Sequence, residues 1–195
     1  MEYKLEITLP ITVIFAISLF IIKESLELVR KSRAKKRKLL AFKAVLKEEL
    51  ELNLWTWKKF KSSLNRIREA GQGGHYNYSI SPAGTERFEV VDAEGYGTGQ
   101  MFPKVEIELH SKLLIDVAEL DAKMYKKLIA SYKGLSELHH LRNRIVDFIH
   151  ENQETVCDID NFTGSTLQDL SPIYTELDAL YQYCTGKKLT EHRMR

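Results

Sequence analysis

The feature that most constrains this chain is an uncharged apolar run near its start. No position from Ile7 to Ile22 carries a charged side chain. The large apolar members of the run are Ile7, Leu9, Ile11, Val13, Ile14, Phe15, Ile17, Leu19, Phe20, Ile21 and Ile22. As a helix it would cover roughly 24 Å, somewhat less than the ~30 Å hydrocarbon core of a bilayer. The run therefore predicts one N-terminal transmembrane helix, with Lys4 and Lys23 reaching toward the headgroups or with local thinning of the bilayer.

A dense basic run follows this apolar segment. Its cationic residues are Arg30, Lys31, Arg33, Lys35, Lys36, Arg37 and Lys38. Basic residues beside a span stay on the cytoplasmic side and attract anionic headgroups. We therefore expect residues 1–29 to form the anchor and its flanks in a cell inner membrane, with the N-terminus outside and residues 30–195 in the cytoplasm. A cleaved signal peptide or a soluble core helix fits less well, because no small-residue cleavage site follows and a core helix would not lead into such a run.

The charge of the remaining chain argues against a nucleic-acid partner. The formal net charge of the whole chain is +2, and the basic run contributes +7, which leaves −5 on the rest. A general nucleic-acid binder is basic over its binding domain. Cys157 and Cys184 form no CxxC pair, and adjacent His139 and His140 would point in different directions on a helix, so we expect neither a metal site nor a cofactor.

The chain after the apolar run predicts a long helix with one apolar face. No glycine or proline lies between Ile11 and Ala70, so the anchor can continue into a cytoplasmic helix. Apolar residues recur there every three or four positions: Leu39, Phe42, Leu46, Leu50, Leu54, Trp57, Phe60, Leu64 and Ile67. This stripe needs cover from other helices or from other copies of the chain, and it predicts a homo-oligomer.

Glycines at 71, 73 and 74 end that helix, and the sequence pattern then changes. Residues 75–109 alternate between apolar and polar, which predicts a small β insertion with a turn at Gly95 to Gly99 and a third strand at 101–109. Helical periodicity from about Ser111 to Asn152 predicts one long helix, and Ser171-Pro172 predicts the start of a short last one. The expected fold is mainly α, with one N-terminal transmembrane helix continuing into a cytoplasmic long-helix hairpin or bundle that carries the β insertion.

One pair of residues suggests catalysis. Arg144 and His150 are six positions apart, within the spacing between arginine and histidine in HEPN ribonucleases, where the cation stabilises phosphate charge and the imidazole moves a proton. Arg142-Asn143 also matches the Arg-Asn opening of that motif, although Asp147 stands where the motif has histidine. No GxSxG elbow, Walker loop or cysteine-nucleophile signature accompanies the pair, so a non-enzymatic function is favoured.

In its organisation the chain resembles the membrane-anchored HEPN-like phage-defence effectors, such as the accessory membrane protein of type VI-B CRISPR systems. The resemblance rests on an N-terminal anchor, a helical cytoplasmic body and the late Arg144 and His150 pair. It implies a ring of protomers whose anchors perturb the membrane in stress or antiviral defence. Two alternatives stay open: a tether or scaffold that recruits a cytosolic partner through residues 75–109, and a membrane-bound HEPN-like ribonuclease.

Overall fold

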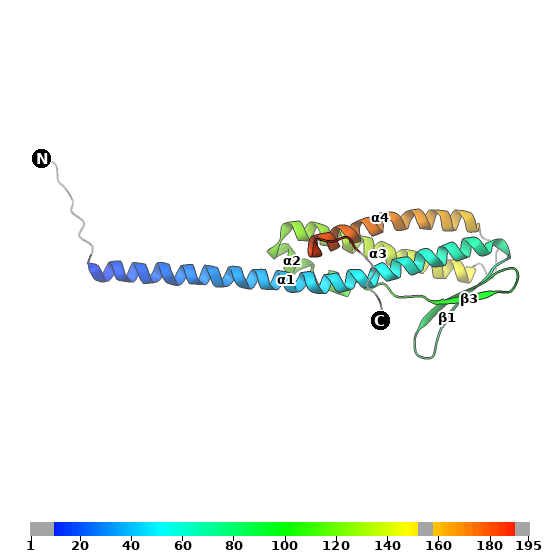
Figure 1. Cartoon of the computed structure of the whole chain (residues 1–195), viewed down its shortest axis with the longest axis horizontal. Coiled ribbons are helices and arrows are strands. Elements are labelled where there is room, and N and C mark those ends of the chain that lie inside the picture. Colours follow the sequence, from blue (N-terminus) through cyan, green and yellow to red (C-terminus); the bar gives the residue numbers. More distant parts are fainter. Residues whose placement is uncertain (1–9, 152–157, 190–195) are drawn as a thin grey trace. The chain divides into compact units, whose positions relative to one another are not determined.

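A computed structural model describes residues 10–151 and 158–189 of the chain. Within these residues the protein is mainly helical, with α1 (Ile11–Ala70), α2 (Glu108–Leu120), α3 (Ala122–Glu151) and α4 (Ile159–Thr185). Figure 1 labels these helices along the chain. The strands are β1 (His75–Ile80), β2 (Glu86–Val91) and β3 (Gly97–Met101). The expectation of a mainly α protein with a small β insertion is confirmed.

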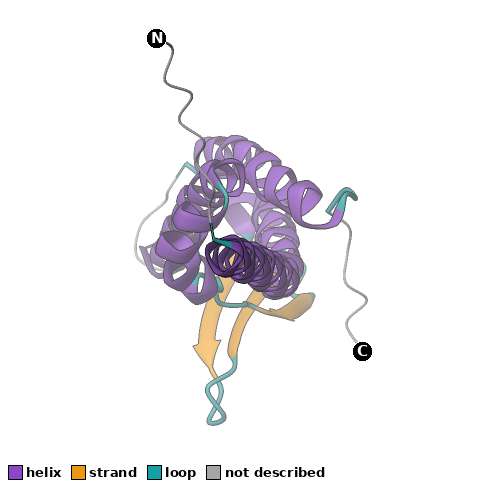
Figure 2. Ribbon diagram, turned by 90° about the vertical axis from the view of Figure 1, so that its left-hand side faces the viewer, coloured by secondary structure: helices purple, strands orange, loops and turns teal. Residues whose placement is uncertain are grey.

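The chain divides into two compact units, Met1–Ala41 and Phe42–Arg195. The described part of the first unit is the beginning of α1. The second unit holds the rest of α1, the other three helices and the sheet. Figure 2 shows the helices of the second unit gathered on one side and its strands on the other.

The core of the second unit covers the apolar stripe of α1. Side chains of the stripe that are almost fully buried are Leu46, Leu50, Leu54, Phe60, Leu64 and Ile67. Residues of α3 and α4 such as Leu128, Leu138 and Leu177 are fully buried as well. A single copy thus buries these six members of the stripe and leaves Leu39, Phe42 and Trp57 half-buried.

The sheet is antiparallel in the order β1-β2-β3 and packs one face on this core. Phe88 and Val90 of β2 are buried, whereas Arg87 and Glu89 between them face solvent. This alternation is expected of a sheet with one covered face. Phe102, just after β3, lies 4.9 Å from Phe60 between ring centroids and joins the sheet to α1.

The predicted positions of the turn and of the third strand are wrong. The turn closes earlier, because the Asp92 carboxylate accepts hydrogen bonds from the Glu94 and Tyr96 backbone N–H groups and Gly95 takes a φ of 88°. The segment predicted as a turn is therefore largely β3, which pairs Gly97 with Val91 and Gly99 with Glu89. Residues 102–107, predicted as a strand, lie between β3 and α2 and belong to neither.

The helix predicted from Ser111 to Asn152 is two helices, α2 and α3. The break falls at Asp121, whose carboxylate accepts hydrogen bonds from the backbone N–H groups of Lys123 and Met124 at 3.0 Å each. A side-chain acceptor of this kind starts a new helix without any glycine or proline. The predicted end at Asn152 lies outside the described residues.

The predicted start of the last helix is also wrong. α4 begins twelve residues earlier at Ile159, and the Asp158 side chain caps it by accepting a hydrogen bond from the Asn161 N–H at 3.1 Å. Pro172 lies inside α4, where it costs one helical hydrogen bond. The turns before it bury Thr163, Thr166 and Leu170, and this packing outweighs the lost bond.

A polar stripe on α1 holds the segment that joins β3 to α2. Asn53 exchanges two hydrogen bonds with the backbone of Glu106, at 2.6 and 3.0 Å. Thr56 donates to the Lys104 carbonyl, and the Gln100 side chain donates to the Ser63 hydroxyl at 2.6 Å. Since Asn53, Thr56 and Ser63 are almost fully buried, these bonds satisfy backbone and side-chain groups that water cannot reach.

Candidate functional site

The described part of the apolar run is exposed on every side of α1. Ile14 is 51% exposed, Phe15 66% and Ile17 49%; Ile14 and Ile17 share one face of the helix, and Phe15 points about 100° away from Ile14. The other large apolar residues of the run that are exposed are Ile11, Val13, Leu19, Phe20, Ile21 and Ile22. Ile7 and Leu9 lie outside the described residues. A helix that is apolar all round is stable only inside a protein core or in lipid.

Over residues 10–151 and 158–189, no helix combines the length and apolar character needed to cross a bilayer. The described apolar run of α1 reaches from Ile11 to Ile22, and Lys23 and Glu24 follow it directly.

The basic run is exposed throughout. All seven of its cations lie on the surface of the first unit, from Arg30 to Lys38. Lys31 forms a 2.8 Å ion pair with Glu27 one turn earlier. This pair is solvent-exposed and contributes little to stability.

The two predicted catalytic residues face different parts of the second unit. The Arg144 guanidinium donates to the Asp169 carboxylate of α4 at 3.1 Å. The exposed His150 ring lies edge-on to the Tyr78 ring of β1, 5.9 Å between centroids. In an RNA-cleaving site both groups should converge on one phosphate. Their partners on α4 and β1 give no such convergence.

Arg142, the other arginine of the motif, belongs to a nearly buried ionic cluster. Its guanidinium bonds the Glu86 carboxylate, which also accepts a 2.6 Å hydrogen bond from the Tyr78 hydroxyl. Lys104 Nζ lies 3.6 Å from the same carboxylate. Glu86 of β2 thus forms ion pairs with Arg142 of α3 and with Lys104 of the segment after β3, and these contacts join the sheet to the helices.

A second buried cluster links a carboxylate, an imidazole and a hydroxyl in the order found in serine hydrolases, but a substrate cannot reach it. Glu49 Oε1 lies 2.8 Å from His110 Nδ1, and His110 Nε2 lies 3.0 Å from the Ser131 hydroxyl. His110 and Ser131 are fully buried and Glu49 is 4% exposed, so a substrate cannot reach the hydroxyl. The three residues come from α1, α2 and α3 with no sequence motif between them, and sequence analysis missed them. We interpret the cluster as a structural link between these helices.

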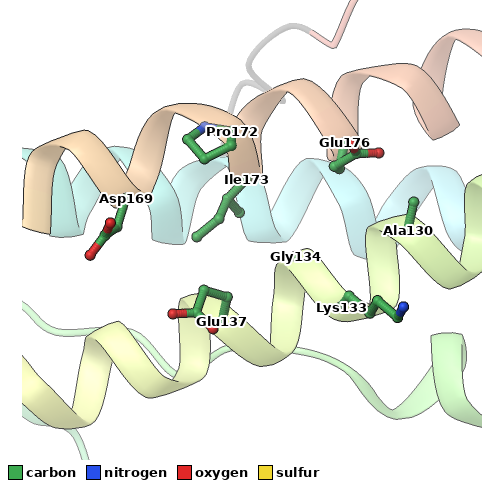
Figure 3. Close-up of a pocket in the computed structure, with 8 residues that line it drawn as sticks. All are labelled: Ala130, Lys133, Gly134, Glu137, Asp169, Pro172, Ile173 and Glu176. Atoms are coloured by element: carbon green, nitrogen blue, oxygen red, sulfur yellow. The ribbon is translucent and has the colours of Figure 1, made fainter.

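An open groove lies between α3 and α4. It has a volume of about 470 Å³ and is lined by Ala130, Gly134 and Glu137 from α3 and by Ile173 and Glu176 from α4. Figure 3 shows Ile173 pointing from α4 toward α3. Among the residues that the structure describes, no group of three or more His, Cys, Asp or Glu side chains is arranged to hold a metal ion.

The described cysteine is a poor nucleophile. Burial raises the pKa of the Cys184 thiol to about 11, so the thiol stays protonated at neutral pH. Cys157 lies outside the described residues.

No protein-family model matches the chain, and neither a curated protein nor a solved structure does. Its function is therefore inferred from its own residues and their geometry.

Proposed function

We propose that this protein is a membrane-anchored tether, which inserts its N-terminal apolar segment into a bilayer and holds its second unit at the anionic cytoplasmic surface. The main support for the proposal is the exposure of apolar side chains all round the beginning of α1: Phe20, Ile21 and Ile22 are 63%, 57% and 55% exposed and point about 100° apart in turn. Such a surface is unfavourable in water by about 25 cal/mol per Å² of apolar area. Transfer into lipid removes that cost.

The basic run supports the direction of insertion. Each Lys or Arg near an anionic leaflet contributes about 1 kcal/mol, and such residues stay on the cytoplasmic side of a span. The apolar sequence extends from Ile11 back to Ile7, which gives the sixteen-residue length that insertion uses. A span this short requires local thinning of the bilayer or extension of the Lys23 side chain toward the headgroups.

A tether is favoured over an enzyme because the polar clusters of the second unit are occupied by one another. Glu86 is bonded to Arg142 and Tyr78, and His110 to Glu49 and Ser131. Neither cluster presents a free nucleophile to a cavity. The exposed part of the sheet offers a surface for a partner.

Vesicle flotation tests the proposal with the full chain and a matched control. Ile17→Glu places a charge in the apolar run and should reduce the bound fraction, because a charge at the centre of a span costs about 2.5–3.5 kcal/mol. Ile115→Glu makes the same change at a residue of α2 that is 77% exposed and should bind like the wild type. Equal flotation of wild type and Ile17→Glu would refute insertion.

Two rival functions give different results in simple assays. A membrane-perturbing effector in antiphage or stress defence would release a trapped dye from the same vesicles, whereas a tether binds and leaves them intact. A HEPN-like ribonuclease would cleave RNA and lose that activity in Arg144→Ala and His150→Ala. Since the two side chains have separate partners, we expect no RNA cleavage by the wild type.

A further inference from the structure

Within the described residues, no strand pairs with the outer edge of β3. The Phe102 N–H donates to the Glu86 carbonyl at 3.0 Å, and the Asp92 N–H donates to the Tyr96 carbonyl at 3.1 Å, so positions 96 and 102 bond toward β2. Hydrogen-bonding direction alternates along an antiparallel strand. The N–H and C=O groups of Gly97, Gly99 and Met101 therefore point away from β2, at the end of the strand order β1-β2-β3.

This edge lacks the features that normally block further pairing. Sheets protect their edges with lysine, proline, bulges or a covering helix. The sequence of β3, Gly-Thr-Gly-Gln-Met, has no charge and no proline, and Gly97, Thr98, Gly99 and Met101 are all exposed.

We propose that β3 pairs antiparallel with β3 of a second copy of this chain about a two-fold axis at Gly99, which makes one six-stranded sheet from two protomers. Only pairings between outward-facing residues form a ladder. Among these, the register that places Gly99 opposite Gly99 overlaps all five residues of the strand. It also sets Gly97 opposite Met101, and Thr98 opposite Gln100.

Side-chain fit favours a second copy in this register. Met101 is 52% exposed, and its neighbour on β2 is the charged Arg87. Across the two-fold axis Met101 would lie over Gly97, which has no side chain, beside Val91 and the Glu89 carboxylate, whose nearest atoms are 3.6 and 3.4 Å from the position of a Cβ at Gly97. A long apolar side chain over a glycine of the neighbouring strand is a favourable cross-strand arrangement.

Gly99 tolerates the substitutions that test the pairing. Its φ is not positive, and a Cβ added there meets no heavy atom within 4 Å. Gly99→Ala therefore keeps the outward N–H, whereas Gly99→Pro removes it without removing a bond to β2. By symmetry the proline removes two intermolecular hydrogen bonds from each dimer, which should raise the dissociation constant about tenfold or more.

Analytical ultracentrifugation of the full chain in detergent micelles measures its mass and so tests whether two copies pair. At a concentration just above the dissociation constant of the wild type, the proposal predicts mainly dimer for the wild type and for Gly99→Ala, and mainly monomer for Gly99→Pro. A monomeric wild type would overturn it, as would a Gly99→Pro variant that dimerises like the wild type. Since this readout needs no lipid, it stands or falls separately from membrane insertion.

Cysteine cross-linking covers the case in which the proline variant fails to fold. Gly99→Cys should form an intermolecular disulfide on mild oxidation, because residues facing each other across such a ladder have Cα atoms about 5.5 Å apart. Ser79→Cys, exposed on β1, would lie five strand spacings from its equivalent, about 24 Å, and should give only the wild-type background. Equal cross-linking of the two variants would refute the register.

Discussion

Replacing Glu49 should destabilise the first turn of α2, because the Glu49 carboxylate, which belongs to α1, caps that turn. The residue at the N-cap of α2, Ile107, makes no side-chain bond to the helix. The Glu49 carboxylate provides the cap instead, and it accepts hydrogen bonds from the Leu109 N–H at 3.0 Å and the His110 N–H at 3.4 Å. These are the positions that an N-cap side chain normally serves. The same carboxylate holds the His110 ring at 2.8 Å.

The magnitude follows from the number of buried groups left without a partner. Glu49→Ala removes the acceptor of two backbone N–H groups and one imidazole nitrogen, in a site where Glu49 is 4% exposed. Breaking a buried, hydrogen-bonded charge network from one side costs about 3–5 kcal/mol. Glu49→Gln keeps one acceptor oxygen and should cost about 1–2 kcal/mol. Either loss is a large share of a typical stability of about 5–15 kcal/mol.

Urea unfolding followed by far-ultraviolet circular dichroism measures this difference, with all variants in the same detergent. Glu48→Ala is the matched control, since Glu48 is the neighbouring residue on α1 and is exposed. The control should stay within about 0.5 kcal/mol of the wild type. If Glu49→Ala were no more destabilising than Glu48→Ala, the capping role of Glu49 would be wrong.

Three further changes test other contacts. Burial, and then the hydrogen bond to Glu51, raise the pKa of Tyr181 to about 12. The neutral phenol therefore adds on the order of 2 kcal/mol to the free energy of unfolding below pH 10, and this contribution is lost as the pH rises through 12. In Tyr181→Phe, the free energy of unfolding should fall less steeply over this alkaline range. Glu86→Ala leaves Arg142 nearly buried without its carboxylate and should lower the unfolding free energy by about 3 kcal/mol, whereas an unchanged urea midpoint would show that the pair contributes nothing. Gly186→Ala, at a φ of 73° after α4, should cost about 1 kcal/mol in thermal unfolding, and a stabilised variant would contradict the left-handed cap.

The parts of the fold that the sequence predicted are those set by periodicity and by glycine. The stripe of α1 from Leu46 to Ile67 is buried as its spacing indicated, except for the half-buried Trp57, and α1 ends at Ala70, just before Gly71. The β insertion falls where the apolar period changes from three or four to two. Each of these signals is local and repeats over many residues.

The errors arise where a single side chain decides the structure. Asp121 starts α3, Asp92 closes the turn before β3, and Asp158 starts α4. Aspartate is common at solvent-exposed positions, so the sequence alone does not show whether a given aspartate caps a helix or turn or is only a surface charge. Pro172 was misleading for the opposite reason, because tertiary packing keeps a proline inside a helix that its local chemistry disfavours.

The buried polar groups could not be predicted because they join distant parts of the chain. Glu49 lies 61 residues from His110, and Asn53 lies 53 residues from Glu106. On the sequence, Glu49 is one of several acidic residues on a charged helix. Only the folded arrangement shows that it faces the start of α2.

Fractionation of lysed cells tests the central claim most directly. If the apolar run of α1 is inserted in lipid, the full chain should remain with the membrane pellet through an alkaline carbonate wash, which releases proteins held by surface charge, and should leave the pellet only with detergent. Recovery of the intact chain in the aqueous supernatant before any detergent is added would contradict membrane insertion.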